Sequence, residues 1–430
     1  MTIVSRRRLG LLAAGLAASA ATLATPAVWA QGRTRGRVVV IGGGWGGATA
    51  AKKIRQLDRA IQVTLIEPSA SFVTCPFSNY VLAGWRQIGQ ITFNYNALAT
   101  RHGVTVVRDS AQAIDAPGRK VRLTGGRTLT YDKLVVAPGI DFRWGAIEGY
   151  DERAAEKMPH AWKAGPQTLL LRRQLEAMAD GGLVVMSVPA NPFRCPPGPY
   201  ERAAQIAWYL KQRKPRSKIL ILDAKDAFSK QALFQDGWQA EYPGMIEWVP
   251  LSRDGAVTKA IPDALTLETQ LGERHRGAVV NVIPPQFAGR IARDSGLANQ
   301  TGWCPVNPAT FESTQVQNVH VIGDAALAGA MPKSGFAANS QGKLVALAIA
   351  NALNARPHAA PTFVNTCYSL ISPEYGISVA EVFRVSDQGI VAAPNAGGVS
   401  PRNADAAFRR SEAQYALGWY ASMTQDIWGS

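Results

Sequence analysis

Short apolar runs that end in glycine-rich turns recur along the chain and predict buried strands. Residues 38–41 are all apolar and β-branched, and they lead directly into the glycines at 42–44. Residues 48–57 then have the composition of a helix, and residues 62–66 form a second, largely apolar run. Apolar strands that alternate with helices are typical of parallel sheets covered by helices. The pattern therefore predicts an α/β fold that begins with a strand–helix–strand unit.

The glycines after the first strand have the spacing of a dinucleotide-binding turn. Gly42, Gly44 and Gly47 form the pattern G-x-G-x-x-G, which permits a tight turn, close approach of a pyrophosphate and packing of the next helix. Glu67 ends the second strand about 20 residues later, where a carboxylate can accept hydrogen bonds from an adenosine ribose. The glycine pattern alone is also compatible with a loop that binds nothing. Together with the strand, the helix and the acid, it favours a dinucleotide.

Two later segments resemble parts of flavoproteins. Residues 131–139 form a strand and turn similar to those at which flavoproteins with two dinucleotide domains leave their first domain. Residues 319–325 repeat the strand-and-turn pattern and contain Gly323 and Asp324. In flavoprotein disulfide reductases an aspartate so placed binds the ribityl chain of FAD. The resemblance implies that the first glycine turn serves FAD.

A second nucleotide-fold domain is expected between these segments, but its turn is unsuited to a nucleotide. Residues 183–188 predict a strand and residues 200–211 a helix, whereas the turn at 189–199 is rich in proline. Proline has no N–H to donate, and its ring fills the space that a pyrophosphate needs. We therefore do not expect NAD(P)H to bind here. The rigid turn instead presents Cys195, and Glu201 follows near the start of the helix.

The first 30 residues have the pattern of an export signal. Three arginines at positions 6–8 precede an apolar run at 11–27, and small residues suited to cleavage follow. Twin arginines indicate a Tat signal peptide over residues 1–30 and a periplasmic protein. An ordinary secretory leader or a retained anchor is the alternative. No later stretch approaches about 18 continuous apolar residues, so no membrane segment is expected in the mature chain.

Composition and charge narrow the class of partner. The 430 residues are 47% hydrophobic, which is ample for large cores in two or three domains. A net charge of +15 favours an acidic partner, anionic lipid or an anionic substrate. The densest basic run, at 211–218, falls where a helix should end, so it is interpreted as a solvated helix terminus. Nucleic acid is therefore not expected as a partner.

The four cysteines lie in different segments and form no familiar motif. There is no Cys-x-x-Cys, no cluster with the spacing of metal ligands, and no Cys-x-x-Cys-His for attaching a c-type haem. Any haem must then belong to another polypeptide. Four cysteines allow three full pairings, and spacing alone does not choose between two structural disulfides and a redox pair. The cysteines are Cys75, Cys195, Cys304 and Cys367.

The segments around the glycines and the cysteines resemble the flavoprotein subunit of flavocytochrome c sulfide dehydrogenase and, more distantly, sulfide:quinone oxidoreductase. The similarity spans essentially the whole mature chain. Its most specific segments are residues 42–47, 74–79, 193–202, 302–306 and 365–369.

The resemblance implies a cofactor, a redox pair and a partner. FAD is expected to be bound covalently through a thioether to Cys75, and Cys195 and Cys367 to form a redox disulfide beside it. Hydrosulfide would attack that disulfide by ordinary exchange chemistry. The implied enzyme is a sulfide–cytochrome c reductase that forms sulfane sulfur or polysulfide and pairs with a c-type cytochrome subunit carrying the haem. Cys304 is interpreted as a structural thiol.

Three further residues are candidates with an ordinary alternative each. Glu201 matches an acidic position near the family's redox site and is a candidate proton acceptor, or else a glutamate that interacts with the helix dipole. Lys333, or a helix N–H group beside it, is a candidate for stabilising anionic reduced flavin, or else a surface lysine. Trp419 shares a helical stripe with Phe408, Tyr415 and Met423, for which core packing is the default and proximity to flavin or cytochrome the hypothesis.

The predicted architecture is α/β, with two Rossmann-like domains of the flavoprotein disulfide reductase type and a C-terminal α+β interface domain. The predicted ranges are 36–148 with 286–355 for the FAD domain, 149–285 for the NAD-like domain and 356–430 for the last domain. A sulfide:quinone oxidoreductase and a redox accessory flavoprotein of the sulfur-oxidation (Sox) system are the alternatives. A quinone enzyme should end in an apolar helix pair, whereas this tail carries several charges.

Overall fold

The computed structural model describes residues 34–358 and 360–429. The predicted Tat signal peptide, residues 1–30, lies outside these ranges. The described chain contains eight small sheets, of which two are parallel sheets of four and five strands. These two sheets confirm the predicted α/β class.

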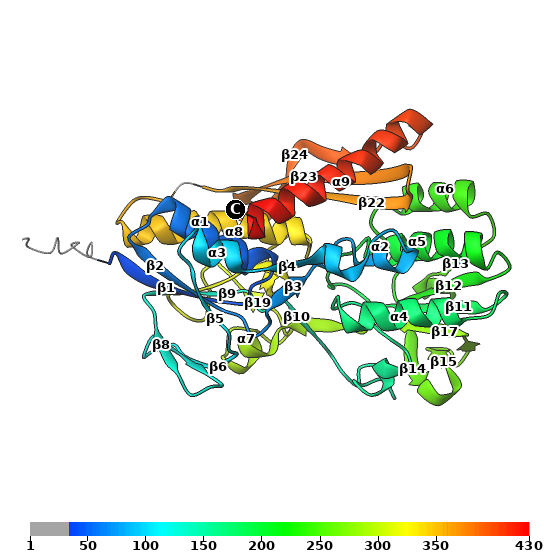
Figure 1. The fold of residues 1–430 in the computed structure, drawn as a ribbon, viewed down its shortest axis with the longest axis horizontal. Coiled ribbons are helices and arrows are strands. Elements are labelled where there is room, and N and C mark those ends of the chain that lie inside the picture. The colour runs from blue at the N-terminus through cyan, green and yellow to red at the C-terminus, as the bar shows by residue number, and fades with distance from the viewer. Residues whose placement is uncertain (1–33, 359, 430) are drawn as a thin grey trace, which may run out of the picture. The chain divides into compact units, whose positions relative to one another are not determined.

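The first parallel sheet has the strand order β20-β9-β1-β2-β5, and every neighbouring pair is parallel. Four of its strands come from the first third of the chain, and β20 joins much later at the edge of the same sheet. Helices α1 and α8 pack against each other beside this sheet (Figure 1). The elements are β1 (Gly36–Ile41), α1 (Trp45–Leu57), β2 (Ile61–Ile66), β5 (Thr105–Val107), β9 (Lys133–Val136), β20 (Val319–Val321) and α8 (Gly335–Leu353).

The second parallel sheet has the order β13-β12-β11-β17 and repeats the strand–helix–strand arrangement. Its central strands are buried and rich in Val, Ile and Leu, as expected of strands covered on both faces. The elements are α4 (Pro166–Ala177), β11 (Leu183–Val188), α5 (Gly198–Arg213), β12 (Lys218–Asp223), α6 (Gln231–Glu241), β13 (Ile246–Val249) and β17 (Val279–Val282).

The chain passes between the two parallel sheets on a pair of antiparallel strands. β10 (Ile140–Phe142) leaves the first sheet, β18 (Gln286–Ala288) returns to it, and Ile140 pairs with Ala288. The second parallel sheet thus lies in sequence between β9 and β20 of the first.

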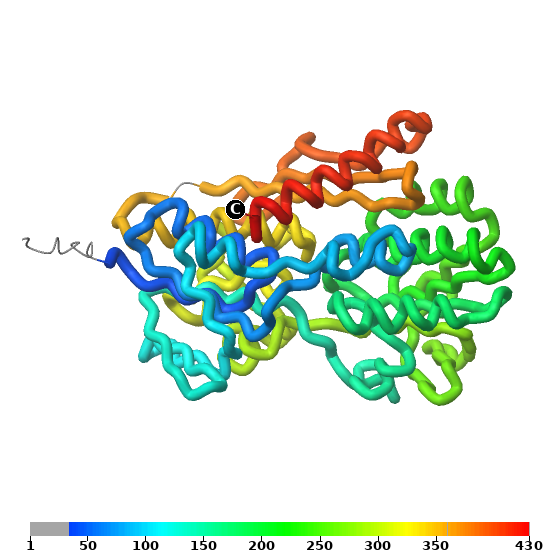
Figure 2. Tube along the Cα trace, viewed as in Figure 1, coloured from blue at the N-terminus to red at the C-terminus, as the bar shows by residue number. Residues whose placement is uncertain are grey.

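A C-terminal antiparallel sheet connects the two nucleotide folds. It consists of β22 (Thr362–Ser372), β23 (Tyr375–Ser386) and β24 (Gly389–Val399), and the long helix α9 (Ala406–Trp428) packs on it. β22 contacts α8 of the first fold and α5 and α6 of the second. The tube in Figure 2 shows this sheet and helix running along both folds. β22 can therefore carry a side chain from the last segment to the junction of the other two.

Shorter elements complete the fold. They are β3 (Ser71–Val73), α2 (Ser78–Ala83), β4 (Thr92–Asn94), α3 (Asn96–Thr100), β6 (Ala111–Asp115), β7 (Lys120–Leu123), β8 (Thr128–Thr130), β14 (Val257–Ile261), β15 (Thr266–Thr269), β16 (Arg274–Arg276), α7 (Arg290–Asp294), β19 (Cys304–Pro305) and β21 (Ala326–Leu327).

The stripe predicted for the core on α9 is wrong at two positions. Phe408 and Tyr415 are 41% and 61% exposed, whereas Arg409 and Glu412 are buried on the packed face. Arg409 Nη1 lies 3.7 Å from Glu412 Oε2, so the two charges are buried as a pair. Pairing lets polar residues occupy the face that apolar residues were expected to fill.

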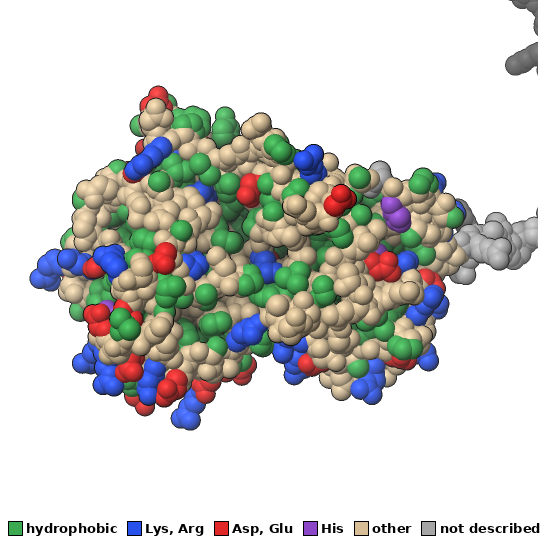
Figure 3. Space-filling model, turned by 180° about the vertical axis from the view of Figure 1, so that it is seen from behind, with side chains coloured by type: hydrophobic (Ala, Val, Ile, Leu, Met, Phe, Trp, Pro, Cys, Tyr) green, Lys and Arg blue, Asp and Glu red, His purple; other side chains and the backbone are tan. Residues whose placement is uncertain are grey.

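Charge of both signs is mixed on the face of the molecule that Figure 3 shows. On the face shown in Figure 3, Lys and Arg side chains alternate with Asp and Glu, and hydrophobic side chains are scattered among them. Surface ion pairs of the described chain include Arg402 with Asp236 and Arg216 with Asp180. Within the described ranges, no helix is both long enough and apolar enough to cross a membrane.

Candidate active site

A cavity of about 500 Å³ lies between the glycine turn after β1 and the loop that carries Cys195. Its volume falls in the usual range for small-molecule and cofactor sites. The walls come from segments far apart in the sequence, which include most of the residues predicted for FAD binding. The predicted residues that line it are Gly42, Gly44, Glu67, Cys75, Cys195, Gly323 and Asp324.

The glycine turn leaves room for a ligand because it has no side chains. Gly42 has φ +95°, and a Cβ there would lie 2.3 Å from the carbonyl oxygen of Ala137. A Cβ on Gly47 would lie 1.9 Å from the carbonyl oxygen of Gly42. Both positions therefore accept only glycine, and the N-terminus of α1 opens on the cavity at Gly44. This cradle suits the pyrophosphate of a dinucleotide.

Glu67 lies where the sequence predicted it, at the end of β2 and on the cavity wall. Its carboxylate accepts hydrogen bonds from the N–H groups of Gly43 and Ser69, each at 2.9 Å. These bonds fix the carboxylate against the turn. Contact with a ribose stays a prediction.

Gly323 and Asp324 follow β20 and meet the glycine turn across the cavity. The N–H of Gly323 donates to Gln341 Oε1 at 2.7 Å, which ties the turn to α8. Burial raises the pKa of Asp324, although Arg194, with Nη1 at 3.8 Å from Asp324 Oδ2, opposes the rise. The distant β20 segment therefore brings Gly323 and Asp324 to the same cavity as the glycine turn, and contact of Asp324 with a ribityl chain stays a prediction.

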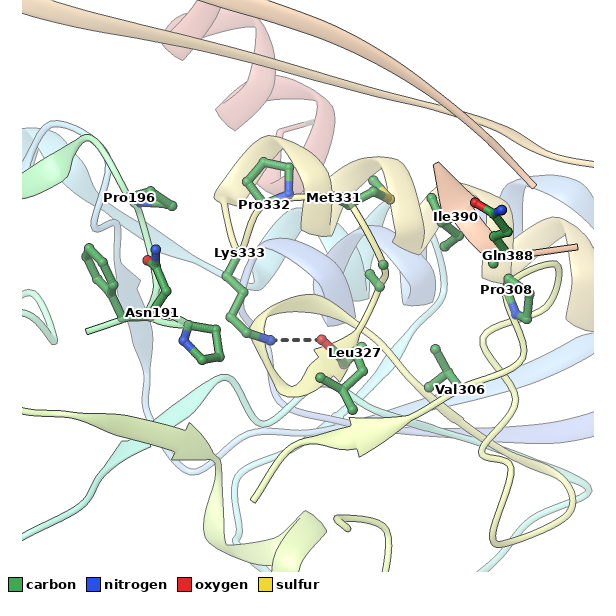
Figure 4. Close-up of a pocket in the computed structure, with 16 residues that line it drawn as sticks. Asn191, Pro196, Val306, Pro308, Leu327, Met331, Pro332, Lys333, Gln388 and Ile390 are labelled. Atoms are coloured by element: carbon green, nitrogen blue, oxygen red, sulfur yellow. Dashed lines mark hydrogen bonds between the residues drawn. The ribbon is translucent and has the colours of Figure 1, made fainter. Parts of the chain in front are cut away.

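Lys333 does not line this cavity, and its role at the flavin stays a prediction. Its Nζ donates to the carbonyl oxygens of Asp324 and Ala326, at 2.7 and 2.9 Å, and lies 3.9 Å from the ring centroid of Trp303. Lys333 instead lines a second cavity of about 460 Å³, as Figure 4 shows. Burial lowers the pKa of Lys333 to about 8. The start of α8, at Gly335, lines the first cavity and is the other candidate.

Cys75 reaches the cavity from the loop between β3 and α2. Its Sγ lies 3.5 Å from the carbonyl oxygen of Trp162. The preceding Thr74 is fully buried, and its hydroxyl lies 2.7 Å from that of Tyr420 on α9. The backbone beside Cys75 is thus anchored, which suits a cysteine that has to meet a cofactor in one position.

Cys195 lies in the proline-rich turn between β11 and α5. The residue has φ +59°, and its N–H donates to the carbonyl oxygen of Lys333 at 2.7 Å. A Cβ on Gly198 would lie 2.9 Å from Cys195 Sγ, so the start of α5 packs closely on the thiol. The turn therefore directs Cys195 into the cavity that the first fold provides.

Cys367 approaches the same place on β22. The pKa of Cys195 is raised well above its usual value by burial, with Cys367 and Glu201 close enough to add to the rise. Burial also raises the pKa of Cys367, although Lys230 opposes the rise. All four cysteines are free thiols in the structure, and the Cys195–Cys367 disulfide stays a prediction.

Cys304 differs from the other three cysteines. It is fully buried in β19 and does not line the cavity. Burial raises the pKa of its thiol to about 12. These properties agree with the interpretation of Cys304 as a structural thiol.

Glu201 is half-buried in the first turn of α5, close enough to both predicted redox cysteines to interact with them electrostatically. Its Oε1 accepts the N–H of Leu370 at 3.0 Å, and its Oε2 accepts Asn79 Nδ2 at 3.3 Å. Burial raises the pKa of Glu201, against the effect of these hydrogen bonds and of nearby Lys230. A glutamate that only interacted with the helix dipole would not need this environment.

Sequence reasoning missed Arg202, which is 2% exposed behind the cysteines. Its guanidinium donates to the side-chain oxygens of Asn79 and Asn281, at 3.0 and 2.9 Å, and to the carbonyl oxygens of His160 and Ala161. Burial lowers its pKa to about 10, so the group stays charged at neutral pH. The sequence feature that could have indicated Arg202 is its position as a charged residue next to small apolar residues of α5.

Trp419 does not line the cavity itself but contacts a residue that does. Its ring stacks on that of Trp45, with centroids 6.2 Å apart, and Trp45 lines the cavity.

In the described part of the chain, no group of three His, Cys, Asp or Glu side chains could hold a metal ion.

Comparison with known families agrees with this arrangement. Residues 168–284 match the model of the central part of the sulfide dehydrogenase (flavocytochrome c) flavoprotein chain, and residues 359–428 match that of the flavocytochrome c sulphide dehydrogenase flavin-binding part. Residues 36–166 match the pyridine nucleotide-disulphide oxidoreductase model. The three matches cover the first nucleotide fold, the inserted fold and the C-terminal sheet in turn.

Individual relatives point the same way. The sulfide dehydrogenase (flavocytochrome c) flavoprotein chain of Chlorobaculum thiosulfatiphilum is 67% identical over 45 residues, which are 10% of this chain and 94% of that sequence. The sulfide-quinone reductase of Aquifex aeolicus is 23% identical over 80% of this chain and 83% of its own. The solved structure of the sulfide:quinone oxidoreductase from Aquifex aeolicus covers 92% of each chain with a TM-score of 0.70 at 19% identity, which shows a shared fold.

The glycine cradle and the segments of Cys75, Cys195 and Cys367 thus lie within the residues that the family models match. The chain therefore belongs to the family of sulfide dehydrogenase (flavocytochrome c) flavoprotein chains, a group of sulfide-oxidising FAD proteins.

Proposed function

We propose that this chain oxidises hydrosulfide to sulfane sulfur through a Cys195–Cys367 disulfide and passes the electrons to a c-type cytochrome. The observation that carries the proposal is that Cys195 lines the FAD cavity while Cys367 and Glu201 lie beside it. The proline-rich turn after β11 supports it, because that turn offers no cradle for a nicotinamide cofactor.

The first step is thiol–disulfide exchange with hydrosulfide as the nucleophile. A new sulfur–sulfur bond forms to one cysteine as the Cys195–Cys367 bond breaks, which leaves a persulfide on one residue and a thiolate on the other. The raised pKa values of both thiols favour their pairing as a disulfide over a resting thiolate. Overall, each hydrosulfide gives up two electrons and one proton as its sulfur becomes sulfane sulfur.

Glu201 receives the proton in this proposal. Its carboxylate is within electrostatic reach of both cysteines, and its pKa is raised by burial, so it can accept a proton closer to neutral pH than an exposed glutamate. Asn79 and the N–H of Leu370 hold the carboxylate in place. Arg202 donates hydrogen bonds to the side chain of Asn79 and to the carbonyl oxygen of His160, which fixes the backbone segments around the carboxylate.

The residues of the first fold would hold FAD. Gly42, Gly44 and Gly47 would hold the pyrophosphate, Glu67 would bind the adenosine ribose, and Asp324 would bind the ribityl chain. Bound FAD supplies a two-electron acceptor beside the cysteine pair that can release single electrons to a haem. Cys75 would tether it by a thioether.

Replacing Cys75 by serine tests the tether. We expect the variant to bind FAD through the cradle but to release it on acid denaturation, because serine cannot form the thioether. In the parent chain the flavin fluorescence should stay with the polypeptide band on a denaturing gel. Release of all flavin from the parent chain would show that the tether is absent.

Replacing Glu201 by glutamine tests the proton acceptor. Protonation of Glu201 removes its ability to accept, so the rate of flavin reduction by sulfide should fall as the pH drops through its raised pKa. We expect this acidic limb, corrected for the hydrosulfide fraction, to be missing in Glu201→Gln, with a rate lower by about 10²-fold at neutral pH. The exposed Glu176 provides the control, because Glu176→Gln should keep the limb. An unchanged profile in Glu201→Gln would contradict the role.

The proposal also includes the electron acceptor, a c-type cytochrome, and the compartment, the periplasm. Tat export over residues 1–30 would place the folded, flavin-loaded chain in the periplasm, where c-type cytochromes work. Sulfide-dependent reduction of cytochrome c by the purified chain, with and without a co-expressed cytochrome subunit, tests this part. Turnover with the cytochrome supports it. Turnover only with a quinone would favour a quinone reductase, and no turnover in any case would favour an accessory role.

A further inference from the structure

The second parallel sheet carries an acidic residue at the position that binds ribose in dinucleotide folds. Asp223 ends β12, which pairs with β11 in parallel as β2 pairs with β1, and Glu67 follows β2. A carboxylate at this position normally accepts hydrogen bonds from a nucleotide. Glu67 faces an open cavity, whereas Asp223 is fully buried.

Three side chains of the protein donate hydrogen bonds to the carboxylate of Asp223. The hydroxyl of Tyr200 donates to Oδ2 at 2.5 Å, and the indole Nε1 of Trp248 donates to the same oxygen at 2.9 Å. Lys225 Nζ donates to Oδ1 at 2.5 Å. Three donors and complete burial leave no acceptor that a ribose could reach, and the bonds of the carboxylate go to the protein itself.

Two of these partners hold the loop of residues 189–199, which carries Cys195. Lys225 Nζ also donates to the carbonyl oxygen of Pro189 at 3.1 Å, where the loop begins, and lies 5.0 Å from the ring centroid of Phe193. Tyr200 follows the end of the loop in the first turn of α5. Asp223 and Lys225 thus join the start, the middle and the end of the loop.

The opposite side of the loop is bound to the FAD fold. There the N–H of Cys195 donates to the carbonyl oxygen of Lys333, the residue that Figure 4 shows between Pro196 and Leu327. Beside Cys195, the N–H of Arg194 also donates to Gln286 Oε1 at 3.0 Å, and its carbonyl oxygen accepts Trp162 Nε1 at 3.2 Å. Loss of the ion pair would therefore release the part of the loop at Pro189 and Phe193, while the backbone at Arg194 and Cys195 would keep its bonds on the opposite side.

We propose that Asp223 and Lys225 are positioning residues for Cys195, in which an acid at a ribose-type position holds the redox loop instead of a nucleotide. The inference rests on the proposed function, in which Cys195 is a redox cysteine. The ion pair restrains the loop so that Cys195 Sγ stays aimed at its partners. Without it, Cys195 becomes more accessible when reduced, and its disulfide with Cys367 forms less readily.

Lys225→Met tests the inference, with Lys214→Met as a matched control. Lys214 and Lys225 are 8% and 9% exposed, and Lys214 donates to the carbonyl oxygens of Glu176 and Met178, away from the loop. The reduced holoprotein is treated with iodoacetamide, and alkylation of Cys195 is followed by peptide mass spectrometry with buried Cys304 as reference. We expect Lys225→Met to raise the Cys195 rate about tenfold and Lys214→Met to leave it unchanged.

Equilibration with glutathione gives the second readout. The equilibrium between dithiol and disulfide should shift about tenfold toward the dithiol in Lys225→Met, roughly 30 mV, and not in Lys214→Met. Tyr200→Phe removes only one hydrogen bond to Asp223 and serves if Lys225→Met does not fold, with an expected rise of about fivefold in alkylation.

Equal alkylation and equal redox equilibrium in the loop variants and the control would overturn the inference. Neither readout needs sulfide turnover. If Lys225→Met differs from the parent chain in both readouts but the parent chain does not react with sulfide, the proposed function is refuted and the positioning role stands.

Discussion

Replacing Cys367 by serine is expected to abolish reduction of the bound flavin by sulfide and to leave reduction by dithionite intact. Serine cannot form the disulfide that hydrosulfide attacks, so the nucleophile has no sulfur electrophile beside the cavity. The rate constant for flavin reduction by sulfide should fall by at least about 10³-fold, as when an essential group of a catalytic unit is removed. Cys195→Ser should have the same effect, because the two cysteines act as one group. Anaerobic stopped-flow absorbance at the flavin band measures both.

Cys304→Ser provides the control for these cysteine variants. Cys304 is buried outside the cavity, so its replacement should leave the sulfide rate within about threefold of the parent chain, even if it costs stability. Retained sulfide reduction in Cys195→Ser or Cys367→Ser would mean that sulfide reaches the flavin without the disulfide. The exchange mechanism would then be wrong.

Replacing Gly47 by alanine should prevent the chain from taking up FAD, because the cradle has to hold the cofactor before Cys75 can attach to it. The new Cβ would lie 1.9 Å from the carbonyl oxygen of Gly42, and neither backbone can yield without opening the turn. Either the cradle deforms or α1 moves away from β1. We expect flavin content, measured as the ratio of flavin to protein absorbance after purification, to fall by at least about tenfold.

Gly46→Ala is the matched control in the same turn of α1. Its Cβ would meet the side chain of Ile322 at 3.2 Å and the carbonyl oxygen of Ala338 at 3.4 Å, contacts that small shifts can relieve. Alanine also favours a helix over glycine by about 1 kcal/mol. Gly46→Ala should therefore keep most of its flavin. Equal flavin content in the two variants would show that the turn is not the cofactor cradle.

Local patterns predicted the cradle because its requirements are local. A buried strand, three spaced glycines and an acid at the end of the next strand each follow from neighbouring residues, and Gly42, Gly47 and Glu67 lie as expected. The proline-rich turn was likewise readable, because proline excludes an N–H donor wherever it lies. These features needed no knowledge of which segments meet.

The sequence alone did not predict the direction of side chains or the pairing of residues that are far apart in the chain. Lys333 was expected at the flavin, but its ammonium donates to the carbonyl oxygens of Asp324 and Ala326, and the residue lines a second cavity. On α9 the buried face includes the pair Arg409 and Glu412, which a search for apolar spacing passes over. Such choices depend on partners that only the folded chain supplies.

The hydrogen bonds of Arg202 show the same limit. Its acceptors come from α2, β17 and the loop before α4, three segments separated by long stretches of sequence. A charged residue within a buried helix marks a site that needs a partner. The sequence around it does not say which partner that is.

Anaerobic titration of the flavin-loaded chain with sulfide and, separately, with NADH tests the central claim most directly. The cysteine pair beside the cavity should let sulfide bleach the flavin absorbance within seconds. The proline-rich turn and the occupied Asp223 carboxylate should leave NADH in large excess without effect over the same time. Rapid bleaching by NADH together with no response to sulfide would contradict the assignment of this chain as a sulfide-oxidising flavoprotein that works through Cys195 and Cys367.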